Sequence, residues 1–427
     1  SEAMQDLVAT HLRLTWHVGH GLLLDDYTAV MSACINDRLT TQDMSVDLVH
    51  GEWLARFQRP WGDMPTVASY RRRFPMRDDV ISDLDNCCLA GERYIALRRI
   101  GRGAMAEIWE AHDRHLCRPV ALKRLRTIAG RSSSDHAQAA ARLVQEARLT
   151  SCLQHAGIVA VHDLHADDAD APFMVMDLLE GPTLAQMIHD HHQPTTSRTR
   201  SERAASQEAL FVAFRAACDA MAHAHRQGVI HRDLKPGNVI VQPGGQSVIL
   251  DWGLARRLSE SADDDDASLG IPLRDACDSA REPQPSSTDT NGPLSCIAPG
   301  DSSCLDHGES RAERTMLIGT PQYMPPEQLH GFADRRSDVF SLGAILYETL
   351  TGRPPYDWGG GALPDDWEQT VAEARIMCPR QLNRRTPRRL AAACRRALSV
   401  SVGSRQCDAS ALVNDVCAST HFLRRQR

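Results

Sequence analysis

The sequence predicts an α+β fold of two lobes, with a helical extension in front of them. Three observations lead to this prediction. Apolar residues follow helical spacing up to about residue 90, and short β-type runs joined by turns begin at Tyr94. Beyond Gly181, long segments rich in Ala and Leu predict a second, larger and mainly helical lobe.

The extension and the small lobe can be divided into elements. Residues 1–90 contain LLLDDYTAVMSACI and end in SYRRRFPMRDDVISDL, which predicts a helical accessory region of unknown role. The runs YIALRRI, EIWEAHD and PVALKRL predict a meander of antiparallel strands. A helix follows in SDHAQAAARLVQEARLTSCLQ, with Ser134 or Asp135 as its N-cap, and GIVAVHDLH and PFMVMDLL add two strands. These elements predict a lobe at 91–179.

The second lobe is predicted at 180–427. Its core helices are QEALFVAFRAACDAMAHAHRQG and SDVFSLGAILYETL, which are long and apolar. The segment at about 259–314 carries DDDD, many Ser, Pro and Thr residues, and few large apolar ones. Because it cannot bury enough surface to offset its ordering entropy, the sequence predicts a disordered or weakly ordered insertion there.

The bulk composition limits the classes of function. The 427 residues carry a formal net charge of -7, so nothing attracts the whole chain to nucleic acid or acidic membranes. No apolar run approaches the roughly 18 to 20 residues of a membrane span, and no signal peptide is evident, so we expect a cytoplasmic protein. The 13 cysteines form no C-x-x-C pair and are interpreted as reduced thiols, mostly buried.

The stretch RRIGRGAMAEIWEA nearly matches a phosphate-binding glycine loop. Gly101 and Gly103 have the required spacing, but Ala106 replaces the third glycine of G-x-G-x-x-G. Alone, this is weak evidence for nucleotide binding, because paired glycines usually make an ordinary tight turn.

An ordered set of downstream motifs changes that interpretation. Val120-Ala121-Leu122-Lys123 stands on the third predicted strand and Glu146 in the next helix, followed by HRDLKPGN, DWG and GTPQYMPPE. With these residues the sequence resembles the protein kinases, and among them the bacterial serine/threonine kinases of eukaryotic (Hanks) type, over about Glu92 to Arg405. The segment PTVASYRRRFPMRDDVISDL resembles, less specifically, one that precedes the kinase domain in planctomycete-type kinases.

The resemblance implies a bilobal protein-kinase fold and transfer of the γ-phosphoryl group of ATP to Ser/Thr hydroxyls of protein substrates. Asp233 would be the catalytic base, and Lys235 would neutralise charge on the γ-phosphate. Lys123 would hold the α- and β-phosphates and be oriented by Glu146. Asn238 and Asp251 offer the oxygen ligands that Mg²⁺ prefers.

The resemblance also implies an ATP site. The glycine hairpin would cover the phosphates, because small residues let the backbone come close. Apolar side chains would enclose the adenine, with one backbone C=O and one N–H at its edge. The hairpin comprises Gly101, Arg102, Gly103, Ala104, Met105 and Ala106; the adenine pocket comprises Ile108 and Ala121 as roof, Ile240 as floor, Met176 as gatekeeper, and the backbone of Asp177 and Leu179.

Further roles follow from the same resemblance. Glu327 would pair with Arg405, and Asp338 would hold the backbone of the catalytic loop. Phosphate on the activation segment, at Thr315 or less favourably Ser310, would be clamped by Arg232, whereas Thr320 would line the substrate groove. A homodimer that autophosphorylates in trans is compatible with this scheme. The insertion would lengthen the activation segment.

Several alternatives stay open at this stage. Trp252 replaces the usual Phe and Pro325 the usual Ala, so a pseudokinase or ATP-binding scaffold is the alternative function. The acidic run at 263–266 is a solvated run or docks on Arg-rich positions of the same chain. The cluster HDHH at 189–192 is interpreted as a polar, solvated loop rather than a metal site, and the segment RQLNRRTPRRL as a solvated helical face rather than a site for an acidic partner. The docking alternative would use Arg384, Arg385, Arg388 and Arg389.

Overall fold

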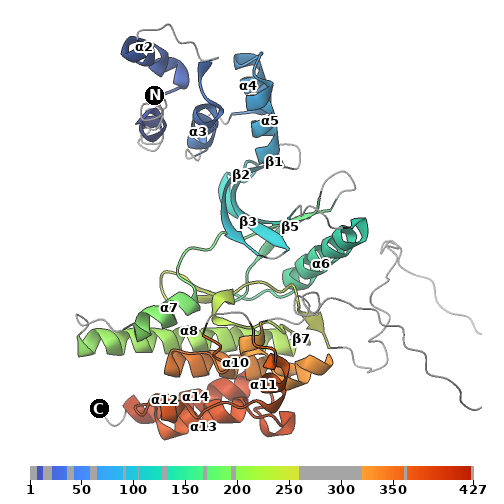
Figure 1. The fold of residues 1–427 in the computed structure, drawn as a ribbon, viewed down its shortest axis with the longest axis vertical. Coiled ribbons are helices and arrows are strands. Elements are labelled where there is room, and N and C mark those ends of the chain that lie inside the picture. The colour runs from blue at the N-terminus through green and yellow to red at the C-terminus, as the bar shows by residue number, and fades with distance from the viewer. Residues whose placement is uncertain are drawn as a thin grey trace, which may run out of the picture.

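The structure is a computed structural model that describes residues 7–12, 22–35, 43–57, 65–89, 93–103, 105–126, 132–166, 171–193, 199–258, 320–359 and 363–424. The predicted insertion at 259–314 lies outside these residues, as do Thr315 and Ala104. Figure 1 shows a curved sheet with a group of helices on one side and a larger helical lobe on the other.

The N-terminal helices are α2 (Leu24–Ile35), α3 (Val46–Arg56), α4 (Val67–Arg73) and α5 (Asp78–Cys87). Side chains fix two of their starts: the Ser45 hydroxyl accepts a hydrogen bond from the Leu48 amide before α3, and Thr66 forms a capping box with Ser69 before α4. Within the predicted helical region, residues Cys88–Leu89 differ by forming strand β1.

These helices have a hydrophobic core of their own, built on Trp53, Tyr70 and Phe74 and completed by Ile95 from the sheet. A buried carboxylate, Glu52, lies among them. It accepts hydrogen bonds from the Leu24 amide at 2.6 Å and the Tyr70 hydroxyl at 2.5 Å. Arg73 pairs with both of its oxygens, so one charged group connects three helices.

The sheet has six strands in the order β1-β2-β3-β4-β6-β5, and neighbouring strands are antiparallel. Helix α6 (Ser133–Ser151) packs against β4, β5 and β6. The predicted N-cap of this helix is wrong by two or three residues: Ser132 is the cap, because it forms a capping box with Asp135. After β1, the strands are β2 (Tyr94–Arg102), β3 (Ala106–Asp113), β4 (Arg118–Leu125), β5 (Val161–His165) and β6 (Phe173–Met176).

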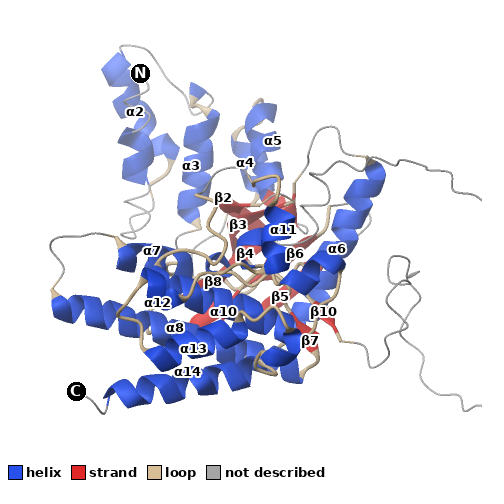
Figure 2. Cartoon of the chain, turned by 60° about the horizontal axis from the view of Figure 1, so that its bottom comes forward, coloured by secondary structure: helices blue, strands red, loops and turns tan. Residues whose placement is uncertain are grey.

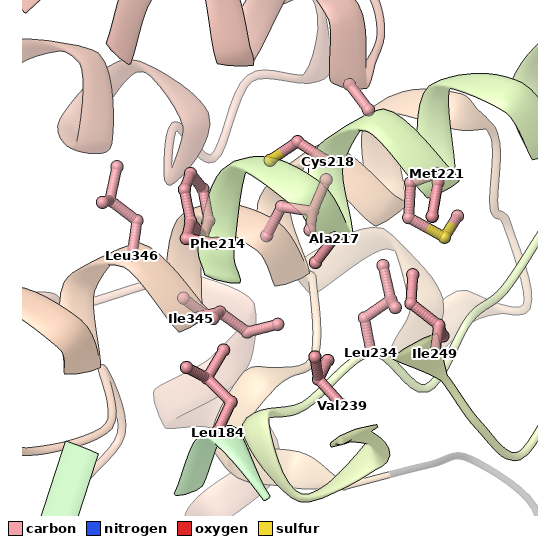
Figure 3. Packing of buried hydrophobic residues seen from close by; sticks show 14 of the residues in the cluster. Leu184, Phe214, Ala217, Cys218, Met221, Leu234, Val239, Ile249, Ile345 and Leu346 are labelled. Carbon is pink, nitrogen blue, oxygen red and sulfur yellow. The ribbon is translucent and has the colours of Figure 1, made fainter. Parts of the chain in front are cut away.

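The larger lobe is mainly helical, as Figure 2 shows, and the two predicted core helices are its longest. Its elements are α7 (Leu184–His192), α8 (Arg200–Arg226), β7 (Val229–Ile230), β8 (Val239–Val241), β9 (Ser247–Ile249), β10 (Arg256–Arg257), α10 (Arg335–Thr351), α11 (Trp367–Glu373), α12 (Pro379–Leu382), α13 (Arg388–Ala397) and α14 (Ala409–Arg424), with 3-10 turns at Pro236–Asn238, Pro321–Tyr323, Pro326–His330 and Val402–Ser404. Helices α8 and α10 meet in the core, where Phe214 lies beside Ile345 and Leu346 (Figure 3). The same core includes Leu234 and Val239, so the segment between them is anchored at both ends.

Two sequence predictions are wrong: one concerns the HDHH cluster of this lobe, and the other concerns the burial of the cysteines. The HDHH cluster is not a loop but the last turn of α7, where Nε2 of His192 donates to the carbonyl of Thr349 at 3.0 Å. No group of three or more His, Cys, Asp or Glu side chains suited to a metal occurs in the described part of the chain. The cysteines that the structure describes are free thiols, but only Cys218 and Cys394 are buried, because the others lie at element ends or surface positions.

No helix within the described ranges has both the length and the apolar character needed to cross a membrane.

Candidate functional site

The glycine hairpin joins β2 to β3. Gly101 lies opposite Ile108, and the Gly103 amide donates to the carbonyl of Ala106 at 2.8 Å. Ala106 begins β3 and is paired with Leu125, so the predicted β conformation at this position is present. Neither glycine has a positive φ, and a Cβ at either would meet its nearest neighbour at 3.4 Å. The turn itself therefore does not require glycine, which leaves close approach of a ligand as the reason for small residues.

Lys123 connects the two lobes. Its ammonium lies 2.6 and 2.8 Å from the two carboxylate oxygens of Glu146 and 2.8 Å from Oδ1 of Asp251. Burial alone would lower the pKa of Lys123, but the charges of Glu146 and Asp251 raise it above its ordinary value. The positive charge of Lys123 in turn lowers the pKa of Asp251. Burial raises the pKa of Glu146, and the charge of Lys123 opposes that rise. The shifts of Lys123 and Asp251 both favour their charged forms.

The catalytic-loop residues form a second cluster. One carboxylate oxygen of Asp233 accepts from the Thr320 amide at 2.8 Å and from its hydroxyl at 3.0 Å, and the other lies 2.9 Å from Nζ of Lys235. Lys235 also donates to the Thr320 hydroxyl at 2.7 Å. The side-chain NH₂ of Asn238 donates to the Asp233 carbonyl at 3.0 Å, which turns the amide oxygen of Asn238 away from that carbonyl.

Asp338, buried in the first turn of α10, holds the start of this loop. It accepts hydrogen bonds from the backbone amides of His231 at 2.9 Å and Arg232 at 3.0 Å, and its Oδ2 lies 2.9 Å from the His225 ring. Burial on its own would raise the pKa of Asp338, but the hydrogen bond and charge of His225 lower it below its ordinary value. Arg232 has a φ of 71°, a left-handed conformation that this anchoring maintains.

The segment that carries Asp251 leaves β9 and passes His231. Asp251 itself has a φ of 56°, and its side chain is half exposed. Trp252 is 1% exposed and packs against the His231 ring at 4.7 Å between centroids. A large ring is therefore buried behind Asp251, as predicted for the Phe that Trp252 replaces, although its indole N–H has no hydrogen-bond partner in the described part of the chain.

The predicted adenine residues line up across neighbouring strands. Ile108 is paired with Lys123, and Ala121 with Met176. Ile240 on β8 forms an isolated antiparallel β-bridge with Thr183, the N-cap residue of α7. Ile108, Ala121 and Met176 thus stand on three neighbouring strands of the sheet, whereas Ile240 stands on a strand of the larger lobe.

Asp177 and Leu179 are predicted to contact the adenine edge through their backbone. In the structure, the amide of Asp177 donates to the carbonyl of Ala160 at 3.0 Å. The carbonyl of Asp177 is therefore the group that a ligand would use, as the sequence predicts. No described residue accepts from the amide of Leu179. These two backbone groups fit the one acceptor and one donor expected at an adenine edge.

The pair of Glu327 and Arg405 is present as predicted. The guanidinium of Arg405 donates to both carboxylate oxygens of Glu327, at 2.6 and 2.8 Å, and the side chain of Arg405 is fully buried. Ser337 donates to the same carboxylate at 2.7 Å. The pair therefore anchors the segment after Thr320 to the helical core.

Sequence reasoning missed some of the residues that organise the site. Thr320 was expected in the substrate groove, but it also bonds Asp233 directly. Gln328 donates to the Arg232 carbonyl at 2.9 Å, and His225 supports Asp338 from α8. The only sequence signal for His225 was a polar residue on an otherwise apolar helical face, and Gln328 gave none.

Comparison with known proteins gives a family. Residues 94–271 and 300–419 match the protein kinase domain, and the stretch between them falls inside the predicted insertion. A probable serine/threonine-protein kinase of Streptomyces coelicolor is 33% identical over 270 residues, 62% of this chain and 31% of the relative. The serine/threonine-protein kinase PknD of Protochlamydia amoebophila is 29% identical over 331 residues, 76% of this chain and 29% of the relative. PknB of Mycobacterium tuberculosis is 31% identical over 269 residues, 62% of this chain and 33% of the relative.

The chain therefore spans a third or less of the length of these curated relatives. The predicted relationship to bacterial serine/threonine kinases is confirmed, as is the predicted α+β bilobal fold. With most of its length matched by the family model and the motif residues gathered between its two lobes, the chain belongs to the protein kinase domain family.

Proposed function

We propose that this chain is a serine/threonine protein kinase that transfers the γ-phosphoryl group of ATP to Ser/Thr hydroxyls of protein substrates. One observation carries the proposal. The ammonium of Lys123, on a strand, lies within 3 Å of the carboxylates of Glu146, on a helix, and Asp251, on a loop of the other lobe. Phosphoryl transfer depends on such positioned charges more than on covalent chemistry.

The proposed roles follow from the contacts. Lys123 would hold the α- and β-phosphates while Glu146 fixes its position. Asp233 would orient and accept the proton of the substrate hydroxyl, since its carboxylate is already held by Thr320 on one side and Lys235 on the other. Lys235 would neutralise charge that develops on the γ-phosphate.

Protein kinases use ATP with a divalent metal, and the residues here fit Mg²⁺. Asp251 offers a carboxylate, and the amide oxygen of Asn238 is available because its NH₂ is bound to the Asp233 carbonyl. When bound, Mg²⁺ neutralises phosphate charge, and ATP supplies the phosphoryl group. This chain's residues then only orient the reactants and hold the proton of the substrate hydroxyl.

The decisive experiment compares Asp233→Asn with the native chain in Mg²⁺-ATP and a generic basic protein. We expect phosphate incorporation to fall by about 10² to 10⁴-fold, the usual contribution of a positioned acid or base. Asp219→Asn, an exposed Asp on α8, is the matched control and should leave the rate unchanged. Equal incorporation by the native chain and Asp233→Asn would refute the catalytic assignment.

The alternative of a pseudokinase or ATP-binding scaffold has less support. Trp252 and Pro325 remove no charged group, and Trp252 is buried as a large apolar ring. A scaffold would bind ATP with Lys123 yet show no incorporation in the same assay.

We propose specificity for Ser/Thr from the hydrogen bond that Nζ of Lys235 donates to the Thr320 hydroxyl at 2.7 Å. This contact narrows the space beside Asp233. Peptides that differ only in a Ser, Thr or Tyr acceptor test it. We expect phosphorylation of the first two, and phosphorylation of the Tyr peptide at a comparable rate would contradict the proposal.

Regulation through the activation segment is proposed from Arg232. Burial, and next the neighbouring charge of Arg256, lower the pKa of Arg232, and its Nε has no hydrogen-bond partner among the described residues. A phosphate on Thr315 or Ser310 would supply the missing negative charge. Mass spectrometry of the ATP-treated protein should find phosphate between Asp251 and Glu327. If this modification occurs in trans within a homodimer, its rate should rise with the square of protein concentration.

A further inference from the structure

Four arginines on the larger lobe form no ion pair with any acidic residue in the described ranges. They lie between α12 and α13 and on α13, and we call them the arginine face: Arg384, Arg385, Arg388 and Arg395. All four are exposed, and none of their side chains makes a hydrogen bond or ion pair with another residue that the structure describes. The chain has a net charge of -7, so acidic residues that could pair with them are abundant. Helices α12 and α13 lie at the end of the molecule remote from the sheet (Figure 1).

Folding of α13 does not explain these arginines. The helix buries its other side through Leu390, Cys394 and Ala397, which pack against α10 and α14. Its first turn contains no acidic residue, and its N-cap, Pro387, provides no side-chain hydrogen bond. Arg388 therefore stands at the positive end of the helix dipole, where a cation is unfavourable. A bound anion would reverse that effect.

A second polar group at this place also lacks a partner. The Thr386 side chain is 4% exposed, and its hydroxyl has no hydrogen-bond partner among the described residues. Thr386 stands in the chain between two members of the arginine face, Arg385 and Arg388. A buried hydroxyl without a hydrogen-bond partner is destabilising. This loop therefore has both unpaired cations and an unsatisfied buried hydroxyl.

The neighbouring residues favour a protein partner. Leu382 is 42% exposed beside Arg384, and Val400 is 50% exposed a few residues beyond Arg395. Arginine is enriched at protein interfaces relative to the rest of the surface, whereas lysine is depleted. From residue 377 to 400 the sequence contains no Lys and no aromatic residue, so stacking platforms for nucleic-acid bases are lacking.

We propose that the arginine face is a docking surface for an acidic segment of a partner protein, in which Asp or Glu residues alternate with aliphatic ones. The planar guanidinium groups bind carboxylates in a bidentate manner, and Leu382 and Val400 contact the aliphatic side chains. The interaction lies apart from the cleft, so it recruits a protein without occupying the ATP site.

The test uses the full chain and a fluorescein-labelled 16-residue peptide of Glu, Asp and Leu, with binding measured by fluorescence anisotropy. Arg384→Glu combined with Arg388→Glu should weaken binding at least about tenfold, equivalent to 1.4 kcal/mol. The matched control is Arg72→Glu combined with Arg200→Glu, which reverses two exposed arginines elsewhere that also lack an ion pair. The control should stay within twofold of the native chain. Unchanged thermal midpoints establish that both variants are folded.

Other outcomes overturn the proposal. An equal loss in the control would show a response to total charge rather than to this surface. Binding of phosphatidylglycerol vesicles or of duplex DNA, without binding of the peptide, would assign another class of partner. Peptide binding that appears only after residues 259–314 are removed would assign the surface to the chain's own acidic run. Failure of the peptide to bind at millimolar concentration would also refute it.

Discussion

The N-terminal helices and the larger lobe are each organised around a buried carboxylate, but the two carboxylates bind different kinds of group. Glu52 is bound by the Arg73 guanidinium, the Tyr70 hydroxyl and one backbone amide. Asp338 is bound by two consecutive backbone amides of the catalytic loop and by a His ring. Glu52 holds helices to helices, whereas Asp338 holds the part of the chain that carries Asp233.

This difference teaches what each carboxylate controls. Side-chain donors such as Arg73 stabilise packing, and their loss leaves a buried charge without a partner. Backbone donors fix the local conformation, including the left-handed φ of Arg232. We therefore expect loss of Glu52 to affect stability alone, and loss of Asp338 to affect both stability and turnover.

The largest effect on stability is expected for Glu52→Gln. It removes the buried charge from the pair with Arg73, leaving only the exposed carboxylate of Asp25 beside that guanidinium, and should cost the N-terminal helices about 3 to 5 kcal/mol. Hydrogen exchange of the amides in α3 and α4 would measure the loss, and turnover should not change. Glu368→Gln, an exposed Glu on α11, is the control. A parallel fall in turnover would mean that these helices support the catalytic lobes directly.

Asp338→Asn should reduce stability less but turnover more. It weakens charge-assisted hydrogen bonds worth about 1.5 to 3 kcal/mol and loosens the position of Asp233, with an expected loss in turnover of about 10 to 100-fold. Denaturant titration and steady-state kinetics at saturating ATP measure the two effects. If only stability falls, Asp338 holds the fold and not the loop, and the contrast with Glu52 disappears.

A smaller, pH-dependent effect is expected where the N-terminal helices meet the sheet. His112 on β3 is 6% exposed and lies 5.7 Å from the Phe57 ring. Burial lowers the pKa of His112, against an opposing effect of Asp113 and a smaller lowering by Arg114. His112 therefore takes up a proton near pH 6.5 in the unfolded chain, but only at lower pH in the folded chain.

Stability should consequently fall as the pH drops from 7 towards 5, by no more than about 1.4 kcal/mol per pH unit, since one proton is involved. Unfolding free energies of the native chain and His112→Gln, measured across this range, test the prediction. The same pH slope in both proteins would exclude His112 as its cause.

The smallest effect is expected for Ala106→Gly, at a position that neither carboxylate touches. Ala106 is already in a paired β conformation with Leu125, so its methyl group is tolerated. We expect ATP affinity to rise by less than about twofold, which is under 0.5 kcal/mol. Calorimetric titration with a non-hydrolysable ATP analogue measures it, and a large rescue of activity would show an impaired hairpin.

The sequence was informative where a motif and its spacing define a side chain's role. Lys123, Glu146, Asp233 and Asp251 could be chosen because each stands in a separate motif in a fixed order. The strands and long helices could be predicted from periodicity, whereas the N-cap of α6 could not, because Ser132, Ser133, Ser134 and Asp135 all suit a cap. Only the three-dimensional arrangement selects one.

Long-range polar contacts could not be predicted. Glu52 meets Arg73 across 21 residues, and His225 meets Asp338 across 113. Nothing in local composition distinguishes such buried partners from ordinary solvated residues. The HDHH cluster shows the same problem in reverse, because a polar run suggested a loop where a helix end packs against the carbonyl of Thr349.

The way the N-terminal core includes Ile95 has a practical consequence for anyone preparing a shorter protein. The family match begins at residue 94, which suggests Tyr94 as a cloning boundary. A fragment cut there would lose β1, the partner of β2, and the helices that cover Ile95 and Leu97. It would present an unpaired strand edge with bare apolar side chains, which is a template for aggregation. A fragment that keeps this edge of the sheet covered should therefore begin before α2.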